Sequence, residues 1–307
     1  MKKILFFLIP VSLLLFAASC DENGQDDSIV FPDPATKDCA VQIEFNKGEV
    51  LQLELPNRPN NSATPVSGDP VTVKIPKIEL TEASRYVLYI DDKFTKAADP
   101  TVWTGRFTFD RSSNTYSLEN FGTIKEKDGM CIVSPVKSKA GDDIQLPATF
   151  TSIKSKDKAQ ANLSRTWKVQ STYVKVKGGK NKVDIAKSFD GCNLYEIGSY
   201  CKGKGVSLTD DDVNQLQGYQ ITEMMMQGNN NIVIGFQGAG SYYGTYTVST
   251  SSFSWSLHNR NKLLPGTTTG LATFLKNQTV ELIVNTTISS SSESYETSLM
   301  FTLQEVK

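Results

Sequence analysis

Leu51-Gln52-Leu53-Glu54-Leu55 alternates a leucine with a polar residue at every step, and this period of two decides the fold class. Successive side chains of a β-strand point to opposite faces, so such a stretch is apolar on one face and wet on the other. The same alternation returns at 71–75, 107–109, 232–236, 253–257 and 299–303. No long helical periodicity competes with it. Short strands separated by turn residues predict an all-β protein made of sandwiches or barrels.

The chain has 307 residues, which is enough for two domains. A polar, aperiodic stretch between Ser152 and Ala161 lies near its middle and separates two strand-rich regions. We therefore expect an N-terminal β-sandwich or barrel over 38–152 and a second antiparallel β domain over 160–307.

The first twenty residues have the layout of a secretory signal. Lys2 and Lys3 precede an uncharged apolar run from Ile4 to Ala17, and small residues then lead to Cys20. The 14 apolar residues would span about 21 Å as a helix, against roughly 30 Å for the hydrocarbon core of a membrane. We expect a signal peptide over 1–19 that is removed on export.

The end of this segment, Phe16-Ala17-Ala18-Ser19-Cys20, resembles the lipobox of bacterial lipoproteins, although Ala17 stands where a leucine is usual. That resemblance implies lipidation of Cys20 and anchoring to the outer membrane. Four carboxylates follow within residues 21–27, and such a stretch cannot bury enough surface to fold. We expect 20–37 to be an acidic, flexible tether. An acidic run at this place resembles the export signal of Bacteroidetes-type surface lipoproteins, which implies exposure on the cell surface.

The second half of the chain resembles the lipocalin-like domains of Bacteroidetes lipoproteins in three places. Trp167 stands early, a Gly244-Thr245-Tyr246-Thr247-Val248 segment stands in the middle, and Leu299-Met300-Phe301-Thr302-Leu303 ends the domain. The resemblance implies an eight-stranded antiparallel barrel, with Trp167 packed at its floor and an interior able to hold a small apolar ligand.

Four cysteines remain after Cys20, and an even number in an exported chain permits two disulfides. Cys192 and Cys201 are close enough in sequence to close one loop, and Cys39 with Cys131 would tie the two ends of the first domain. We favour this pairing over buried free thiols. Zinc is disfavoured, because neither a CxxC spacing nor a histidine pair accompanies the cysteines.

Most catalytic chemistries lack their residues here. His258 is the only histidine, and the sequence has no GxSxG, HExxH, phosphate-loop or dinucleotide motif. The net charge of −1 becomes about −3 once Lys2 and Lys3 are removed, so no basic field attracts nucleic acid. We expect neither an enzyme, a resident cofactor, a metal site nor a nucleic-acid partner.

An aromatic hairpin supplies the candidate ligand-binding residues: Tyr242, Tyr243 and Trp255. The two tyrosines could stack on a sugar or line a pocket mouth, whereas alternation places Trp255 on the core side. The leading hypothesis is a surface-anchored binding module for a small apolar molecule or a glycan. The alternative is a structural, adhesion or envelope-interaction protein whose barrel is filled by its own side chains.

Overall fold

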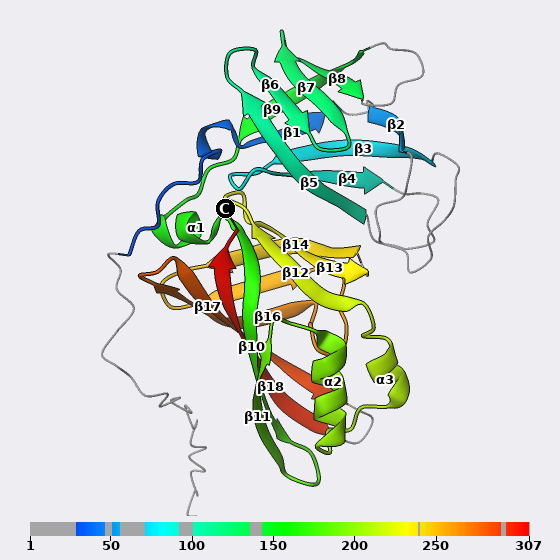
Figure 1. Cartoon of the computed structure of the whole chain (residues 1–307), viewed down its shortest axis with the longest axis vertical. Helices are drawn as coiled ribbons and strands as arrows, with labels where there is room; N and C mark the ends of the chain where they lie inside the picture. Colours follow the sequence, from blue (N-terminus) through cyan, green and yellow to red (C-terminus); the bar gives the residue numbers. More distant parts are fainter. Residues whose placement is uncertain are drawn as a thin grey trace, which may run out of the picture.

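We describe the fold from a computed structural model of the chain, over residues 29–46, 51–55, 71–91, 101–135, 143–238, 240–289 and 293–306. The expected signal peptide, Cys20 and the first part of the acidic tether lie outside these residues. Two antiparallel β-barrels follow one another along the chain and are stacked one above the other in Figure 1. The all-β fold class is confirmed. Of the two alternatives for the N-terminal domain, a sandwich or a barrel, the structure shows the barrel.

The first barrel is a meander from β2 to β9, in which consecutive strands pair, whereas β1 pairs with β9 and β3. Strand order runs β1-β9-β8-β7-β6-β5-β4-β3, and β3 pairs back onto β1 to close an eight-stranded ring. Residues 71–75 of β3 pair with β2 along the same edge that β1 occupies further on. The strands are β1 (Val41–Phe45), β2 (Leu51–Leu55), β3 (Val71–Leu80), β4 (Arg85–Asp91), β5 (Thr101–Asp110), β6 (Thr115–Leu118), β7 (Gly122–Lys127), β8 (Met130–Pro135) and β9 (Ile144–Ser152).

The second barrel is a similar ring of eight antiparallel strands, and β11 takes the place that β2 has in the first barrel. Strand order runs β10-β12-β13-β14-β15-β16-β17-β18, and β18 pairs back onto β10 to close the ring, while β11 forms a hairpin with β10. The strands are β10 (Thr166–Gly178), β11 (Val183–Asp190), β12 (Tyr219–Met226), β13 (Asn231–Gly238), β14 (Gly240–Val248), β15 (Phe253–Leu257), β16 (Thr267–Leu275), β17 (Thr279–Ser289) and β18 (Ser294–Glu305).

Three short α-helices accompany the strands in the described part of the chain, with a single 3-10 turn (Lys37–Cys39) ahead of β1. Helix α1 (Lys158–Leu163) stands between the barrels, and α2 (Leu194–Gly203) and α3 (Asp210–Asn214) flank the second one (Figure 1). Thr209 and Asp212 form the capping box at α3 that their spacing predicts.

Each barrel encloses its own apolar core, built from the inward-facing side chains of the alternating strands. In the second barrel Leu299, Phe301 and Leu303 are fully buried, as their alternation predicts. Trp167 is also fully buried there, and its indole N–H donates to the Leu163 carbonyl at 2.9 Å, which satisfies its one polar group. Because these large side chains pack against one another, much of the barrel interior is occupied by the protein itself.

The segment that enters the first barrel begins by packing on the second. Phe31 is buried, and its ring meets those of Trp167 and Phe274 edge-on, with centroids 6.3 and 6.0 Å away. Its backbone N–H donates to Asn162 Oδ1 at 2.9 Å. Residues 29–37, expected to belong to the flexible tether, are therefore partly docked. One phenylalanine in a preformed apolar gap supplies the burial that the acidic run lacks.

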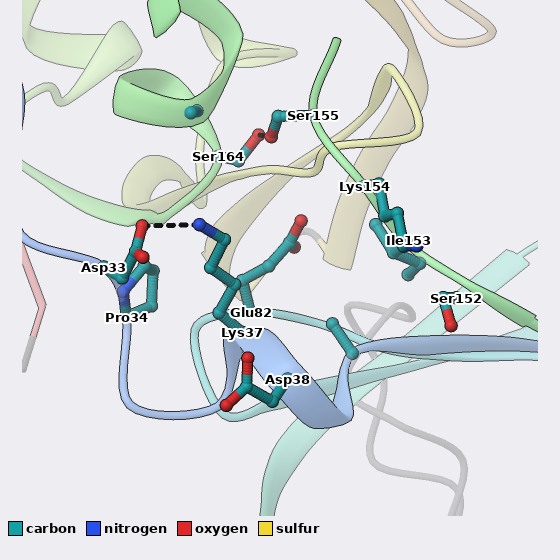
Figure 2. Close-up of a pocket in the computed structure, with 12 residues that line it drawn as sticks. Asp33, Pro34, Lys37, Asp38, Glu82, Ser152, Ile153, Lys154, Ser155 and Ser164 are labelled. Atoms are coloured by element: carbon teal, nitrogen blue, oxygen red, sulfur yellow. Dashed lines mark hydrogen bonds and ion pairs between the residues drawn. The ribbon is translucent and has the colours of Figure 1, made fainter. Parts of the chain in front are cut away.

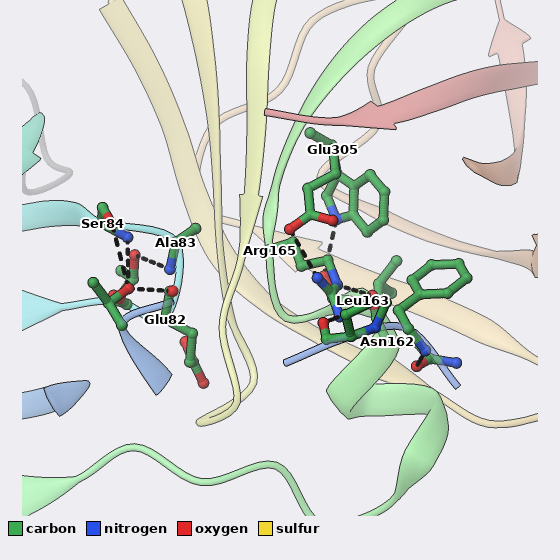
Figure 3. Close-up of polar contacts among 12 residues, drawn as sticks. Glu82, Ala83, Ser84, Asn162, Leu163, Arg165 and Glu305 are labelled. Atoms are coloured by element: carbon green, nitrogen blue, oxygen red, sulfur yellow. Dashed lines mark hydrogen bonds and ion pairs between the residues drawn. The ribbon is translucent and has the colours of Figure 1, made fainter. Parts of the chain in front are cut away.

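Arg165 fixes this docking from within the second barrel (Figure 3). Its guanidinium is buried and donates to Glu305 at 2.8 Å, to the Pro32 carbonyl at 2.6 Å and to the Asn162 carbonyl at 3.0 Å. One cation thus joins the incoming segment, the end of α1 and the last strand. Several charge-assisted hydrogen bonds compensate the desolvation of a buried arginine.

Candidate functional site

The three aromatic residues expected to bind a ligand are buried and do not share a surface. Tyr242 points into the second barrel, where its ring packs on Phe236 at 4.8 Å and Tyr219 at 5.7 Å. Trp255 lies in the same core, as its alternation predicts, and donates its indole N–H to the Pro265 carbonyl at 3.2 Å. Tyr243 points the other way, because neighbours on a strand face opposite sides. The structure therefore offers no stacking platform made of these three rings.

Tyr243 belongs instead to an apolar seam between the barrels, formed by Val87, Val102, Met225, Val233 and Tyr243. In the second barrel Met225 lies opposite Val233, and Val233 lies opposite Tyr243, so three adjacent strands present one row. Tyr89 of the first barrel packs on this seam, with its ring 5.9 Å from that of Tyr243. The seam joins outward faces of the two barrels and excludes water from them.

A hydrogen-bonded carboxylate lies next to the seam. Glu79 of the first barrel is fully buried and accepts from the Tyr89 hydroxyl at 2.6 Å and from Lys77 at 3.0 Å. The side-chain amides of Asn229 and Asn231, which belong to the second barrel, donate to it at 3.1 and 2.5 Å. Both oxygens of Glu79 therefore have donors, and the contact is satisfied without any ligand.

A cavity of about 500 Å³ opens at the same junction (Figure 2). Its walls come from residues 33–40 ahead of β1, from the turn between β3 and β4, from residues 152–155 after β9, and from Ala161 and Ser164 around α1. The first barrel, the segment ahead of it and the connection through α1 therefore contribute. The volume falls within the range of sites for small molecules, roughly 300–1,000 Å³.

Glu82 is the buried acid of this cavity. It is 4 % exposed and belongs to the β3–β4 turn. Its Oε1 accepts from the Gly228 N–H at 3.2 Å, and its Oε2 has no hydrogen-bond partner among the described residues. Burial raises the pKa of this carboxyl to about 7, and the neighbouring Glu79 adds to the rise, whereas backbone N–H groups and Lys37 oppose it. The group is thus partly ionised at neutral pH.

The turn that carries Glu82 is held by the incoming segment (Figure 3). The Thr36 hydroxyl donates to the Glu82 carbonyl and accepts from the Ser84 N–H at 3.0 Å. On the other side Gly228 approaches so closely that a Cβ there would lie 2.6 Å from Glu82 Oε1. Contacts from both barrels therefore fix the position of the carboxyl.

Hydroxyl groups line the wall beside α1. Ser155 Oγ lies 3.1 Å from Ser164 Oγ, and both residues line the cavity. Ser164 donates to the Gln160 carbonyl at 2.7 Å and lies 3.4 Å from the Tyr246 hydroxyl. The buried Gln160 Nε2 has no hydrogen-bond partner within the described residues. The cavity therefore combines a carboxyl with hydroxyl groups, which suits a polar ligand better than an apolar one.

The described residues that line the cavity supply a carboxyl from Glu82 and hydroxyl groups from Ser155 and Ser164. Within the described residues no cluster of three or more acidic, cysteine or histidine side chains can hold a metal ion. His258 follows β15 in a bend and stacks on Tyr243 of the apolar seam, with ring centroids 4.4 Å apart. Sequence reasoning missed Glu82, because its burial depends on Gly228, 146 residues further along the chain.

The four cysteines expected to form two disulfides are buried free thiols in the structure. This corrects the expected pairing. Each thiol packs as a small apolar group in the core of its own barrel, which needs no covalent partner. Burial raises the pKa of Cys131 and Cys192 to about 12 and that of Cys201 to about 11, and it also raises that of Cys39.

Comparison with protein-family models finds no match for this chain, and comparison with curated proteins finds none either. Helices long and apolar enough to cross a membrane are absent from the described residues.

Proposed function

We propose that this chain is an exported, lipid-anchored binding protein that holds a small hydroxylated ligand of the glycan type in the cavity between its barrels. One observation carries the proposal: the deeply buried Glu82 is a lining residue of that cavity, and its Oε2 has no donor among the described residues. A buried polar group without a partner costs free energy, and a ligand that supplies the missing donor recovers it. The proposed role is binding without turnover.

The proposed location rests on the sequence of the first residues. Removal of 1–19 and lipidation of Cys20 would anchor the chain to the outer membrane through residues 21–28, which precede the docked segment. Mass spectrometry of the mature protein tests this step. A diacylated or triacylated Cys20 at the N-terminus is expected, and an unmodified Cys20 within a longer chain contradicts the anchor.

Binding is tested by a thermal-shift screen of mono- and disaccharides against the full chain in detergent. A ligand that binds only the folded state raises the unfolding midpoint. Ala161→Phe places a ring against the cavity and is expected to abolish the shift, whereas Lys158→Phe adds the same ring at an exposed position of α1. The proposal fails if no saccharide shifts the midpoint, or if Ala161→Phe leaves a shift unchanged.

The alternative function is a structural or adhesion module of the cell surface. The apolar seam and the packed interior of the second barrel favour it, because both stabilise a rigid two-barrel body without a ligand. The same screen separates the two proposals, since a purely structural module shows no saccharide-dependent shift in any variant.

A further inference from the structure

We infer that the ligand of the junction cavity carries a protonated amine, which pairs with the carboxylate of Glu82. This inference rests on the proposed function and names the chemical class of its ligand. Its basis is the pairing of charges around the cavity and the hydrogen bonds that Glu82 lacks.

The other acidic side chains that line the cavity already have cationic partners. Asp33 forms an ion pair with Lys37 at 2.7 Å, and Asp38 forms one with Arg111 at 3.4 Å. Both pairs lie at the exposed edge, where water screens them. Lys154 also lies at this edge and is exposed, so its charge is solvated. The buried negative group that lacks an ion-pair partner within the described residues is Glu82.

The groups around Glu82 do not supply the missing charge. Glu79 is a like charge, and its two oxygens are taken up by their own donors. Lys37, the cation whose field reaches Glu82, is bonded to Asp33. Gly228 offers one backbone N–H to Oε1. Among the described residues, the site therefore lacks a positive charge together with a donor directed at Oε2.

An ammonium group meets both requirements, whereas a hydroxyl meets only the second. Hydrogen bonds between two charged groups are about twice as strong as neutral ones, and a buried carboxylate without a counter-charge is costly. An ammonium also has three donors, so it can reach the Ser155 and Ser164 oxygens in the same cavity. Hydroxyls elsewhere on the ligand would suit the remaining polar wall, which points to an amino sugar.

The inference predicts the direction of the pH dependence. The ammonium pairs with the ionised carboxyl, so acid weakens binding by protonating Glu82, whose pKa is about 7. Glu79, Lys37 and the Gly228 N–H are the neighbours that shift this titration. A Glu82→Gln chain keeps the shape of the side chain and loses both its charge and this titration.

Glucosamine and glucose are the sharpest probes, because they differ only by an amine in place of one hydroxyl. Isothermal titration calorimetry on the full chain in detergent at pH 7.5 compares them, with N-acetylglucosamine as an uncharged control. We expect glucosamine to bind at least about tenfold more tightly than either neutral sugar. Glu82→Gln should remove that preference, and lowering the pH to 5.5 should weaken glucosamine binding to the unchanged chain only.

The outcomes separate the two levels of the argument. If glucosamine and glucose bind with equal affinity, and Ala161→Phe abolishes the binding of both, the ligand needs no amine and this inference is overturned. The cavity then remains a saccharide site. A glucosamine preference that survives in Glu82→Gln also overturns the inference. If none of the three sugars binds, both the inference and the saccharide-binding function are contradicted. A thermal-unfolding scan of each variant shows whether a loss of binding reflects a loss of fold.

Discussion

The two barrels meet in two ways, and the difference between these contacts separates packing from binding. Along the apolar seam, Val87 and Val102 pack on Met225, Val233 and Tyr243, so side chains of the two barrels themselves make the contact. Around the cavity, the same two barrels and their connection approach Glu82 closely and leave one of its oxygens without a donor.

The two regions are built from different elements, since strand residues supply the seam, whereas turns and connecting segments supply most of the cavity wall. The seam closes because its side chains are apolar and complementary in shape, which makes burial favourable by itself. The cavity is bounded by the connection through α1 and by the segment carrying Thr36, whose hydroxyl donates to the Glu82 carbonyl. The apolar seam thus holds the two barrels together beside a polar cavity that the described side chains do not fill.

The largest expected effect comes from placing a charge in the seam. Val233 is 2 % exposed between Met225 and Tyr243, so Val233→Asp buries an unpaired carboxylate. We expect the free energy of unfolding to fall by about 4 kcal/mol in urea denaturation. Gln237→Asp, at an exposed position of the same strand, controls for the added charge and should cost less than about 0.5 kcal/mol. Equal losses in both variants would show that the seam is not buried.

Loss of the docked segment is expected to have the next largest effect. Phe31→Ala removes a ring packed on Trp167 and Phe274, and we expect a loss of about 3 kcal/mol in the same measurement. Val30→Ala is the matched control, because Val30 is 62 % exposed and should tolerate the change. A Phe31→Ala chain as stable as the control would mean that the tether extends through this segment after all.

The buried acid should make stability depend on pH. The folded chain holds the pKa of Glu82 at about 7, above its ordinary value of 4.5, so the protonated form favours folding. That contribution is complete below pH 4.5 and is lost as the pH rises through 7. We expect the stability of Glu82→Gln relative to the unchanged chain to increase by about 3 kcal/mol between pH 4.5 and pH 8.

The exposed Glu44 supplies the control for this pH effect. Glu44→Gln makes the same substitution at an exposed position, so it reports any effect of the change that does not depend on burial. A Glu82→Gln difference that stays constant with pH would show that the acid is not desolvated in the folded state.

The smallest expected effect concerns the cores on either side of the junction. Because their thiols are free, dithiothreitol should leave the unfolding midpoint unchanged. In a Cys20→Ala chain, four thiols should react with Ellman's reagent after unfolding without reductant, and none before unfolding, because they are buried. Fewer than four reactive thiols in the unfolded chain would contradict the free thiols and support the predicted disulfides.

Local patterns predicted the strands, because the alternation at 51–55, 253–257 and 299–303 depends only on neighbouring residues. The capping box at Thr209 was readable for the same reason. The seam also left a signal, since Met224-Met225-Met226 and Ile232-Val233-Ile234 are apolar at every position, as strands buried on both faces are.

The cavity left no such signal. Glu82 stands in an ordinary turn, and its burial arises from Gly228 and Ser155, which are distant in sequence. The disulfide prediction failed for a related reason, because an even count of cysteines says nothing about which core each thiol enters. Tyr242 and Tyr243 show the limit of local reasoning as well, since only the neighbouring barrel explains why the outward-facing ring is buried.

The most direct measurement is the titration of the Glu82 carboxyl by carbon-13 NMR of a glutamate-labelled chain. A Glu82→Gln chain assigns the signal. This titration shows whether Glu82 is a buried acid that binds an amine. We predict that the pKa of Glu82 is about 7 without ligand and decreases clearly when glucosamine is added. A pKa near the ordinary 4.5 that glucosamine does not move would contradict both the buried acid and the site built around it.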